Sequence, residues 1–303
     1  MKFFCVTPCL NAEKYIEETM LSVLKQVVFE SLQFSLQYVV IDGGSGDSTV
    51  KIIETVIAQF SEAKNIQVAY FSEKDSGMYD ALVKGFKYEI NQSDVYSYIN
   101  AGDYYSKHAF EIVSEVFGKN DVHFLTGINT IYNKKSHLTN FYMPFLYSKK
   151  NIISGFHGKI LPCVQQESTF WTRKLHTKIN FEKLRSLRFA GDFYLWKTFI
   201  QFEPLYIVRA WLGGFKVHDG QLSSNFVEEY HAELGSISQK PTIVDYIFAY
   251  AHKILWCLPD KVKQKLSFHL FVYDNVNQEY RLTKHIFSGL LQRRPQSQTL
   301  KSR

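Results

Sequence analysis

Short runs of β-branched and aromatic residues alternate with segments of helical spacing through the first third of the chain. Each run ends at a polar or turn residue, as buried parallel strands do. The predicted strands are Phe3–Thr7, Leu36–Asp42, Ile66–Phe71 and Val95–Ile99. Apolar positions at helical spacing follow Asn11, a predicted N-cap, and also follow Asp47 and Ser48. The alternation predicts an α/β fold with a mostly parallel central sheet flanked by helices.

Polar residues cluster directly after these predicted strands. The four clusters are Thr7–Asn11, Asp42–Thr49, Glu73–Gly85 and Asn100–Asp103. The carboxyl ends of parallel strands meet at one edge of a sheet, where α/β proteins bind ligands. We therefore expect nucleotide binding and chemistry at that edge.

The regular alternation fades beyond about residue 120, and aromatic, Lys-rich and loop-like sequence continues to about Gly235. Three helical stretches follow: Ile243–Leu258, a second through Phe271, and a third around Tyr280–Leu291. The pattern predicts a ligand-binding half over residues 1–118, a second half over 119–240 that adds to the sheet and forms another wall, and a C-terminal helical region over 241–303.

Composition limits the class of protein. With 46% apolar residues among 303, the chain can bury a sizeable core, which argues against disordered and fibrous classes. Its longest apolar stretch, Ile243–Leu258, is interrupted by Asp245 and Lys253, so we expect no transmembrane segment. The four cysteines form no CxxC pair and no zinc-ligand spacing, so we expect a reducing cytoplasm.

Basic charge is concentrated at the C-terminal end. From Arg281 onward there are six Lys or Arg residues and no Asp or Glu, so the rest of the chain balances at 35 − 6 = 29 basic against 29 acidic residues. We expect no nucleic-acid partner. Two interpretations of the tail stay open: it binds an anionic membrane surface, which implies a peripheral position on the inner face of the cytoplasmic membrane, or it is a solvated tail.

Two carboxylates at the predicted edge are candidates for chemistry. Asp103 follows the strand that ends at Ile99 and suits Mg²⁺ or Mn²⁺ held with a diphosphate, or it caps a helix beginning near Ser106. Asp42 precedes a glycine-rich turn, so it can accept a hydrogen bond from a base or ribose, or merely begin an ordinary βα turn. The same loop also resembles the S-adenosylmethionine loop of methyltransferases, which keeps that class open.

Together the four clusters resemble glycosyltransferase family 2, inverting enzymes with the GT-A fold that build bacterial polysaccharides. The matching segments are Val6–Asn11, Val40–Thr49, Glu73–Ala81 and Ile99–Asp103. The resemblance implies that Asp42 contacts the base, that Asp103 binds the metal, and that the nucleotide pocket is lined by Thr7, Pro8 and Asn11. Asp75 and Gly77 precede a predicted helix whose N-terminus favours anionic oxygens, although alone this segment is typical of a solvated helix start.

The resemblance continues less sharply to about Ser223. It implies that Asp192 is the general base and that the acceptor side is shaped by Gln165, Gln166 and Trp196. Two positions depart from the family pattern: Gly102 stands where many relatives have the first acid of the metal pair, and Val83 where Asn is common. His218 is a candidate second metal ligand, with a satisfied surface or core histidine as the alternative.

These observations predict a glycosyltransferase that uses a UDP-sugar and Mg²⁺ or Mn²⁺. Its acceptor would be a growing cell-surface polysaccharide, such as a capsule or lipopolysaccharide, or a lipid-linked oligosaccharide. Inversion needs a single base that takes the proton from the acceptor hydroxyl, while the metal stabilises the departing diphosphate. The alternatives are a methyltransferase and a catalytically degenerate glycosyltransferase-like partner protein.

Overall fold

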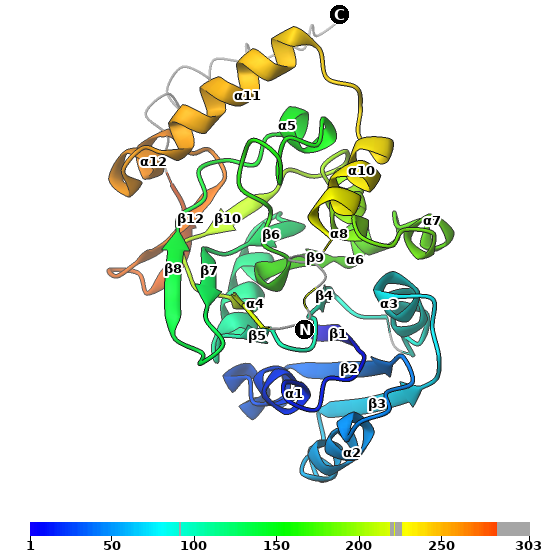
Figure 1. The fold of residues 1–303 in the computed structure, drawn as a ribbon. Helices are drawn as coiled ribbons and strands as arrows, with labels where there is room; N and C mark the ends of the chain where they lie inside the picture. The colour runs from blue at the N-terminus through cyan, green and yellow to red at the C-terminus, as the bar shows by residue number, and fades with distance from the viewer. Residues whose placement is uncertain (91, 219–220, 222–225, 284–303) are drawn as a thin grey trace, which may run out of the picture.

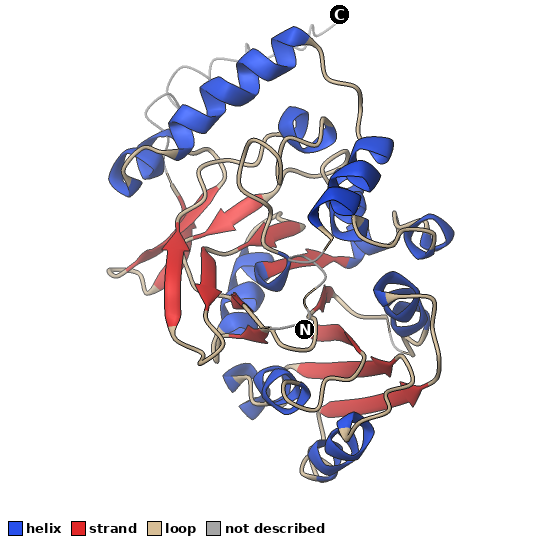
Figure 2. Cartoon of the chain, in the orientation of Figure 1, coloured by secondary structure: helices blue, strands red, loops and turns tan. Residues whose placement is uncertain are grey.

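The computed structural model describes residues 1–90, 92–218, 221 and 226–283. A nine-stranded sheet crosses the molecule in the order β13-β12-β10-β6-β9-β4-β1-β2-β3, and a smaller sheet has the order β5-β11-β7-β8 (Figure 1). Figure 2 shows helices on both sides of the large sheet. The α/β class predicted from the sequence is therefore confirmed.

The first half of the chain supplies four parallel strands of the large sheet. They are β1 (Lys2–Cys9), β2 (Ser35–Asp42), β3 (Ile66–Ser72) and β4 (Val95–Tyr98), each within two residues of its predicted bounds. The register pairs Cys9 with Asp42, and Asp42 with Ser72. The carboxyl ends of these strands thus form one edge, as predicted.

Helices pack on the two faces of this sheet through separate apolar clusters. One face is covered by α1 (Ile16–Leu24), the short η1 (Val27–Glu30), α2 (Thr49–Ala58) and α4 (Ala109–Lys119). The other face is covered by α3 (Met78–Lys87), α6 (Arg173–His176), α7 (Phe181–Arg185) and α8 (Gly191–Phe199). Helix α8 carries Asp192, the predicted general base, in its first turn.

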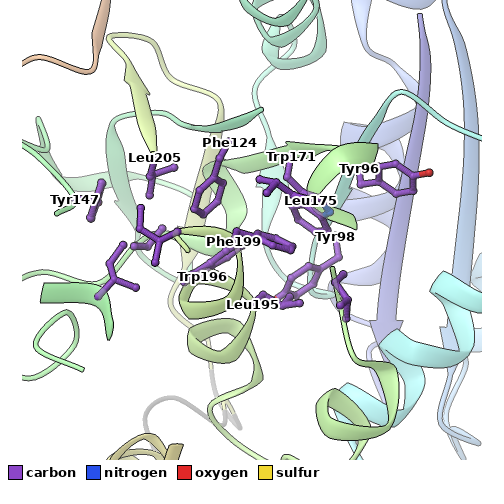
Figure 3. Packing of buried hydrophobic residues seen from close by; sticks show 14 of the residues in the cluster. Tyr96, Tyr98, Phe124, Tyr147, Trp171, Leu175, Leu195, Trp196, Phe199 and Leu205 are labelled. Carbon is purple, nitrogen blue, oxygen red and sulfur yellow. The ribbon is translucent and has the colours of Figure 1, made fainter. Parts of the chain in front are cut away.

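Aromatic side chains fix α8 to the sheet. Figure 3 shows Trp196 and Phe199 of α8 facing Trp171 and Phe124. The ring centroids of Trp171 lie 6.1 Å from Trp196 and 5.3 Å from Phe199. Trp171, Phe124 and Phe199 are fully buried. Rings of this size dominate core stability, so the position of the first turn of α8 is well determined.

The second half of the chain extends the sheet with short strands. The large sheet gains β6 (Phe124–Thr126), β9 (Thr169–Thr172) and β10 (Tyr206–Val208), and β9 runs antiparallel to both β4 and β6. The small sheet consists of β5 (Tyr104–Tyr105), β7 (Asn129–Tyr132), β8 (Leu138–Tyr142) and β11 (Gly213–Lys216). Helix α5 (Lys149–Ile153) and the short η2 (Gln166–Ser168) complete this half.

The C-terminal region is only partly helical. Helix α10 (Val227–Ile237) precedes this region, which contains α11 (Ile243–Trp256) and α12 (Asp260–Leu266). The predicted second helix through Phe271 is wrong beyond Leu266, because Leu270 and Phe271 of β12 (Leu270–Asp274) are buried beside β10. The start of the predicted third helix is instead the edge strand β13 (Glu279–Leu282), and its remainder lies outside the described residues.

Two sequence expectations concern membranes. Across the part of the chain that the structure describes, every helix is too short or too polar to cross a bilayer. Arg281, counted among the tail cations without acidic neighbours, in fact forms ion pairs with Glu279 at 2.6 Å and Asp274 at 3.4 Å. The other five basic residues of the tail lie outside the described residues.

Candidate active site at the carboxyl edge of the sheet

The loops after β1 and β2 are tied together at the sheet edge. Asn11 has a φ of 48°, in the left-handed region that Asn tolerates, and its Oδ1 accepts a hydrogen bond from Gly46 N at 2.9 Å. Its own N–H donates to Ser45 Oγ at 2.7 Å. The predicted N-cap at Asn11 is wrong, because this side chain is engaged by the opposite loop and α1 begins at Ile16 after Tyr15.

Asp42 is buried and organises its own turn. Its Oδ2 accepts hydrogen bonds from Gly44 N at 3.2 Å, Ser45 N at 3.0 Å and Ser72 Oγ at 2.6 Å, while its Oδ1 accepts from Ser45 Oγ. Burial by itself raises the pKa of Asp42, but the hydrogen bonds from Ser45, Ser72 and Gly44 outweigh it and hold the pKa below its ordinary value. The carboxylate is ionised, and its contact with a base stays a prediction.

Thr7 and Pro8, the other predicted pocket residues on β1, are buried at the end of the strand. The hydroxyl of Tyr38 donates to Thr7 Oγ1 at 2.8 Å. Their side chains therefore support the edge within the sheet. Their contact with a nucleotide stays a prediction.

Asp75 reaches across to the Asp42 loop. A Cβ at Gly43 would lie 2.8 Å from Asp75 Oδ2, so a larger residue at position 43 would displace the Asp75 carboxyl group. Asp75 Oδ1 accepts from Gly77 N at 2.9 Å, and Gly77 has a φ of 131° immediately before α3. Partial burial raises the pKa of Asp75 despite the Gly77 hydrogen bond. Asp75 and Gly77 therefore lie beside the Asp42 loop, and their contact with a sugar donor stays a prediction.

Asp103 lies in the turn after β4 and is only 4% exposed. Lys216 N donates to its Oδ1 at 3.0 Å, and its carboxyl group is hydrogen-bonded to that of Glu167. Burial and then the charge of Glu167 raise the pKa of Asp103 well above its ordinary value, and burial raises the pKa of Glu167 to about 7. The alternative role as a helix cap is wrong, because α4 begins at Ala109 after His108.

The position that departs from the family pattern, Gly102, lies against His218. A Cβ at Gly102 would be 2.6 Å from His218 Nε2, and Gly102 has a φ of 115°. The imidazole therefore fills the space that a side chain at position 102 would need. It also packs on the ring of Tyr15, with centroids 4.4 Å apart. Sequence reasoning proposed His218 as a ligand but gave no reason for glycine at position 102.

The metal-binding side chains around Asp103 and Gly102 fit a hard divalent cation only in part. Two carboxyl groups, Asp103 and Glu167, and the His218 imidazole are side chains that bind Mn²⁺. Among the described residues, however, no three His, Cys, Asp or Glu side chains are close enough to form a complete ion site. Oxygens from a bound diphosphate would have to complete the coordination, as is common for Mg²⁺.

Asp192 lies in the first turn of α8. Its Oδ1 accepts from Phe193 N at 2.7 Å. Burial raises its pKa to about 6, against the lowering effect of hydrogen bonds from Phe193 N and from Tyr79. The charge of Asp192 in turn contributes to the raised pKa of Glu167. The candidate metal corner and the candidate base are therefore electrostatically linked through Glu167.

Tyr79, from the third sequence cluster, braces the Asp192 turn. Its hydroxyl accepts from Asp192 N at 3.1 Å, and its one proton is shared between Phe189 O at 3.2 Å and the Asp192 carboxyl group. A Cβ at Gly191 would lie 2.5 Å from the ring of Tyr79, so only glycine permits this contact. The donor half is thus joined to α8 by one buried side chain. Sequence reasoning matched Tyr79 to a motif but assigned it no role.

Glu233 of α10 holds the same turn from the other side. Its carboxylate accepts hydrogen bonds from three successive backbone N–H groups, Arg188 at 2.9 Å, Phe189 at 2.7 Å and Ala190 at 2.6 Å. Glu233 was not identified from the sequence, because no local pattern around it indicates hydrogen-bond partners more than forty positions away.

A cavity of about 10 Å³, enough for one water, lies beside Asp192. Its lining includes His157 and Trp196, and the buried atoms His157 Nε2 and Trp196 Nε1 have no hydrogen-bond partner among the described residues. The predicted acceptor residues Gln165 and Gln166 are instead engaged with backbone groups, Gln165 with Thr130 and Gln166 with Tyr98. They hold the segment that carries Glu167.

Comparisons with known proteins identify the fold and the family. The model of the family Glycosyl transferase family 2 matches residues 4–194. An uncharacterized glycosyltransferase of Rickettsia typhi is 27% identical over 253 residues, which cover 78% of this chain and 71% of the relative. TarS 1–349 of S. aureus in complex with UDP has a TM-score of 0.55 at 17% identity, with 88% of this chain and 69% of that chain covered.

A mannosyltransferase of Pyrobaculum calidifontis, PcManGT, in complex with GDP-Man and Mn²⁺, has the same fold, with a TM-score of 0.55 at 12% identity; 84% of this chain and 70% of that chain are covered. The GT-A arrangement expected from the sequence is therefore confirmed. Because the family model matches well over half of its residues, the chain belongs to glycosyltransferase family 2, and it is a nucleotide-sugar transferase.

Proposed function

We propose that this protein transfers a sugar from a UDP-sugar to a saccharide acceptor, with inversion at the anomeric carbon and with Asp192 as the general base. The observation that carries the proposal is a set of three carboxyl groups with raised pKa values, the buried Asp103 and Glu167 and the part-buried Asp192. One end of this set lies in the metal motif of the family, and the other lies beside a cavity on the acceptor side.

In the proposed reaction, Asp192 accepts the proton of an acceptor hydroxyl as that oxygen attacks the anomeric carbon. The bond from this carbon to the diphosphate oxygen breaks, and the nucleoside diphosphate leaves with the bonding electrons. A carboxylate whose pKa is about 6 is ionised at neutral pH yet more basic than an ordinary Asp, which suits a general base. In the cavity, which has room for one water, the ring nitrogens of His157 and Trp196 offer one acceptor and one donor to a single hydroxyl or water.

We propose that Asp103 and His218 hold Mg²⁺ or Mn²⁺ together with the donor diphosphate. The ion would supply positive charge against the leaving group. Glycine at position 102 supports this assignment, because it leaves room for His218 where a carboxylate stands in many relatives. The remaining donor-side assignments, Thr7, Pro8, Asn11, Asp42, Asp75 and Gly77, belong to the same proposal.

The acceptor we propose is a growing cell-surface polysaccharide or lipid-linked oligosaccharide, used at the inner face of the cytoplasmic membrane. TarS is similar in fold and its structure contains UDP, whereas the PcManGT structure contains GDP-Man. UDP-sugars are therefore the first donors to test and GDP-sugars the second. Family membership disfavours the methyltransferase alternative.

The decisive experiment is a screen of UDP- and GDP-sugars, scored by release of nucleoside diphosphate with and without Mn²⁺, with S-adenosylmethionine binding measured in parallel. The anomeric configuration of the product should then be determined by NMR. Retention of configuration, or full transfer by Asp192→Asn, would refute the mechanism. Binding of S-adenosylmethionine without sugar transfer would refute the function.

A further inference from the structure

Helix α11 is apolar on two opposite sides. Its inner side is buried against the body of the protein through Ala249, His252 and Trp256. The outer side carries a stripe of four exposed apolar residues, whose exposed fractions are 80% for Ile243, 65% for Ile247, 56% for Tyr250 and 68% for Ile254. At about 100° per residue, these four side chains fall within about 60° of one another around the helix.

The exposed stripe belongs to a firmly held helix. Thr242 and Asp245 form a capping box at the first turn. On the inner side, His252 Nδ1 is hydrogen-bonded to Asn151 Nδ2 at 3.1 Å, and Asp245 forms an ion pair with Lys150 at 2.7 Å. Helix α11 therefore keeps one side on α5 and presents the other outward, at the end of the molecule farthest from α2 (Figure 1).

Positive charge flanks the stripe. Residues 240–266 contain Lys240, Lys253, Lys261 and Lys265, which have no ion-pair partner among the described residues. The two acidic residues of this segment are both paired with lysine, Asp245 with Lys150 and Asp260 with Lys263. An apolar helix face with cations beside it is complementary to a bilayer surface with anionic head groups.

We propose that α11 docks on an anionic lipid surface, with Ile243, Ile247, Tyr250 and Ile254 entering the head-group region and the neighbouring lysines contacting lipid phosphates. A row of apolar residues this exposed is unusual on a surface that meets only water. The inference deepens the proposed function and rests on it only for the acceptor: α5, on which α11 packs, carries Ile152, and Ile152 lines the cavity beside Asp192. Docking would bring the acceptor side close to a lipid-linked substrate.

The test uses the full chain and the double variant Ile247→Asp/Ile254→Asp. The matched control is Leu32→Asp/Val276→Asp, which changes two residues that are 74% and 89% exposed elsewhere on the surface. Co-sedimentation is measured with vesicles of phosphatidylcholine alone and of equal parts phosphatidylcholine and phosphatidylglycerol. We expect the wild type and the control to bind the anionic vesicles, and the double variant to bind at least tenfold more weakly. Added salt should weaken the binding.

Equal vesicle binding by the double variant and the wild type would overturn the proposal. So would a dimer, seen by light scattering without lipid, that the double variant disrupts, since a second copy would then cover the stripe. A third outcome against it is vesicle binding that appears only after deletion of residues 284–303, because the chain's own end would then cover the stripe.

Release of nucleoside diphosphate with a soluble acceptor separates this inference from the proposed function. The double variant should retain wild-type activity there, because the changed residues lie outside the candidate active site. If the wild type transfers no sugar, the proposed function fails, while the vesicle result still decides the role of α11.

Discussion

Replacing the proposed base should make the protein more stable while it removes activity. Asp192 holds a negative charge in a part-buried position, with hydrogen bonds from Phe193 N and Tyr79 that only partly offset the cost of removing the carboxylate from water. Asp192→Asn keeps the shape and an acceptor oxygen for Phe193 N but carries no charge. A general base contributes about 10²-fold or more, so sugar transfer should fall at least that far.

The expected gain in stability follows from the pKa of Asp192, which is raised from 3.8 to about 6. This difference corresponds to about 3 kcal/mol, lost from the folded state when the carboxyl group ionises. The folded protein binds the proton more tightly than the unfolded chain, so stability falls as the pH rises from about 4 to about 6, and the full cost persists above. A weaker hydrogen bond to Phe193 N should reduce the gain by about 1 kcal/mol.

Urea unfolding of both proteins at several pH values measures this directly. We expect Asp192→Asn to be more stable by about 2 kcal/mol at pH 8, and the difference to vanish near pH 4. In the wild type, the transfer rate should fall as the pH decreases through about 6. A variant that is less stable at pH 8, or a difference that does not depend on pH, would refute the account of a strained, part-buried carboxylate.

Four further changes test other parts of the site. Asp103→Ala should abolish Mn²⁺-dependent turnover and leave the fold intact, as measured by Mn²⁺ titration and circular dichroism; normal turnover would contradict the assignment of Asp103 as a metal ligand. Gly102→Ala should lower the free energy of unfolding by about 1–3 kcal/mol, from its φ of 115° and its contact with His218, and an unchanged urea midpoint would contradict that contact. Tyr79→Phe should shift the acid limb of the pH–rate profile to higher pH, because the Tyr79 hydrogen bond lowers the pKa of Asp192; an unchanged limb would argue against that hydrogen bond. Asp42→Ala should raise donor KM with little change in kcat, and the reverse would exclude a ground-state contact with the base.

The first half of the fold could be predicted because its signals are local. The strands β1, β2 and β4 are mostly apolar and are buried along almost their whole length, so composition marks them, whereas β3 at the edge of the sheet is only partly buried. The N-cap at Asn11 failed for a tertiary reason. Asn11 Oδ1 bonds to Gly46 N on the next loop, and that contact, more than thirty residues distant, overrides the local preference of Asn for helix starts.

The second half could not be predicted in the same way, because its strands have only three to five residues. β9 lies between β4 and β6 and runs antiparallel to both, and no turn signal in the sequence joins it to either strand. The β12–β13 hairpin was predicted as helix because the apolar residues of this segment fit helical spacing. The segment instead forms strands because Leu270 and Phe271 pair with β10. In this half, the structure of a segment depends on the strand with which it pairs, and the local sequence does not indicate that strand.

The two departures from the family pattern bear on whether the site is degenerate. If Gly102 were a sign of lost catalytic function, the space beside it could be empty. Instead, the His218 ring occupies the space that a side chain at position 102 would need. Val83 is fully buried in the core that joins α3 to the sheet, so its apolar side chain strengthens the helix that carries Tyr79. Both departures are therefore compensated by nearby contacts. Compensation of this kind is expected where selection maintains a working site, and it argues against a catalytically degenerate partner protein.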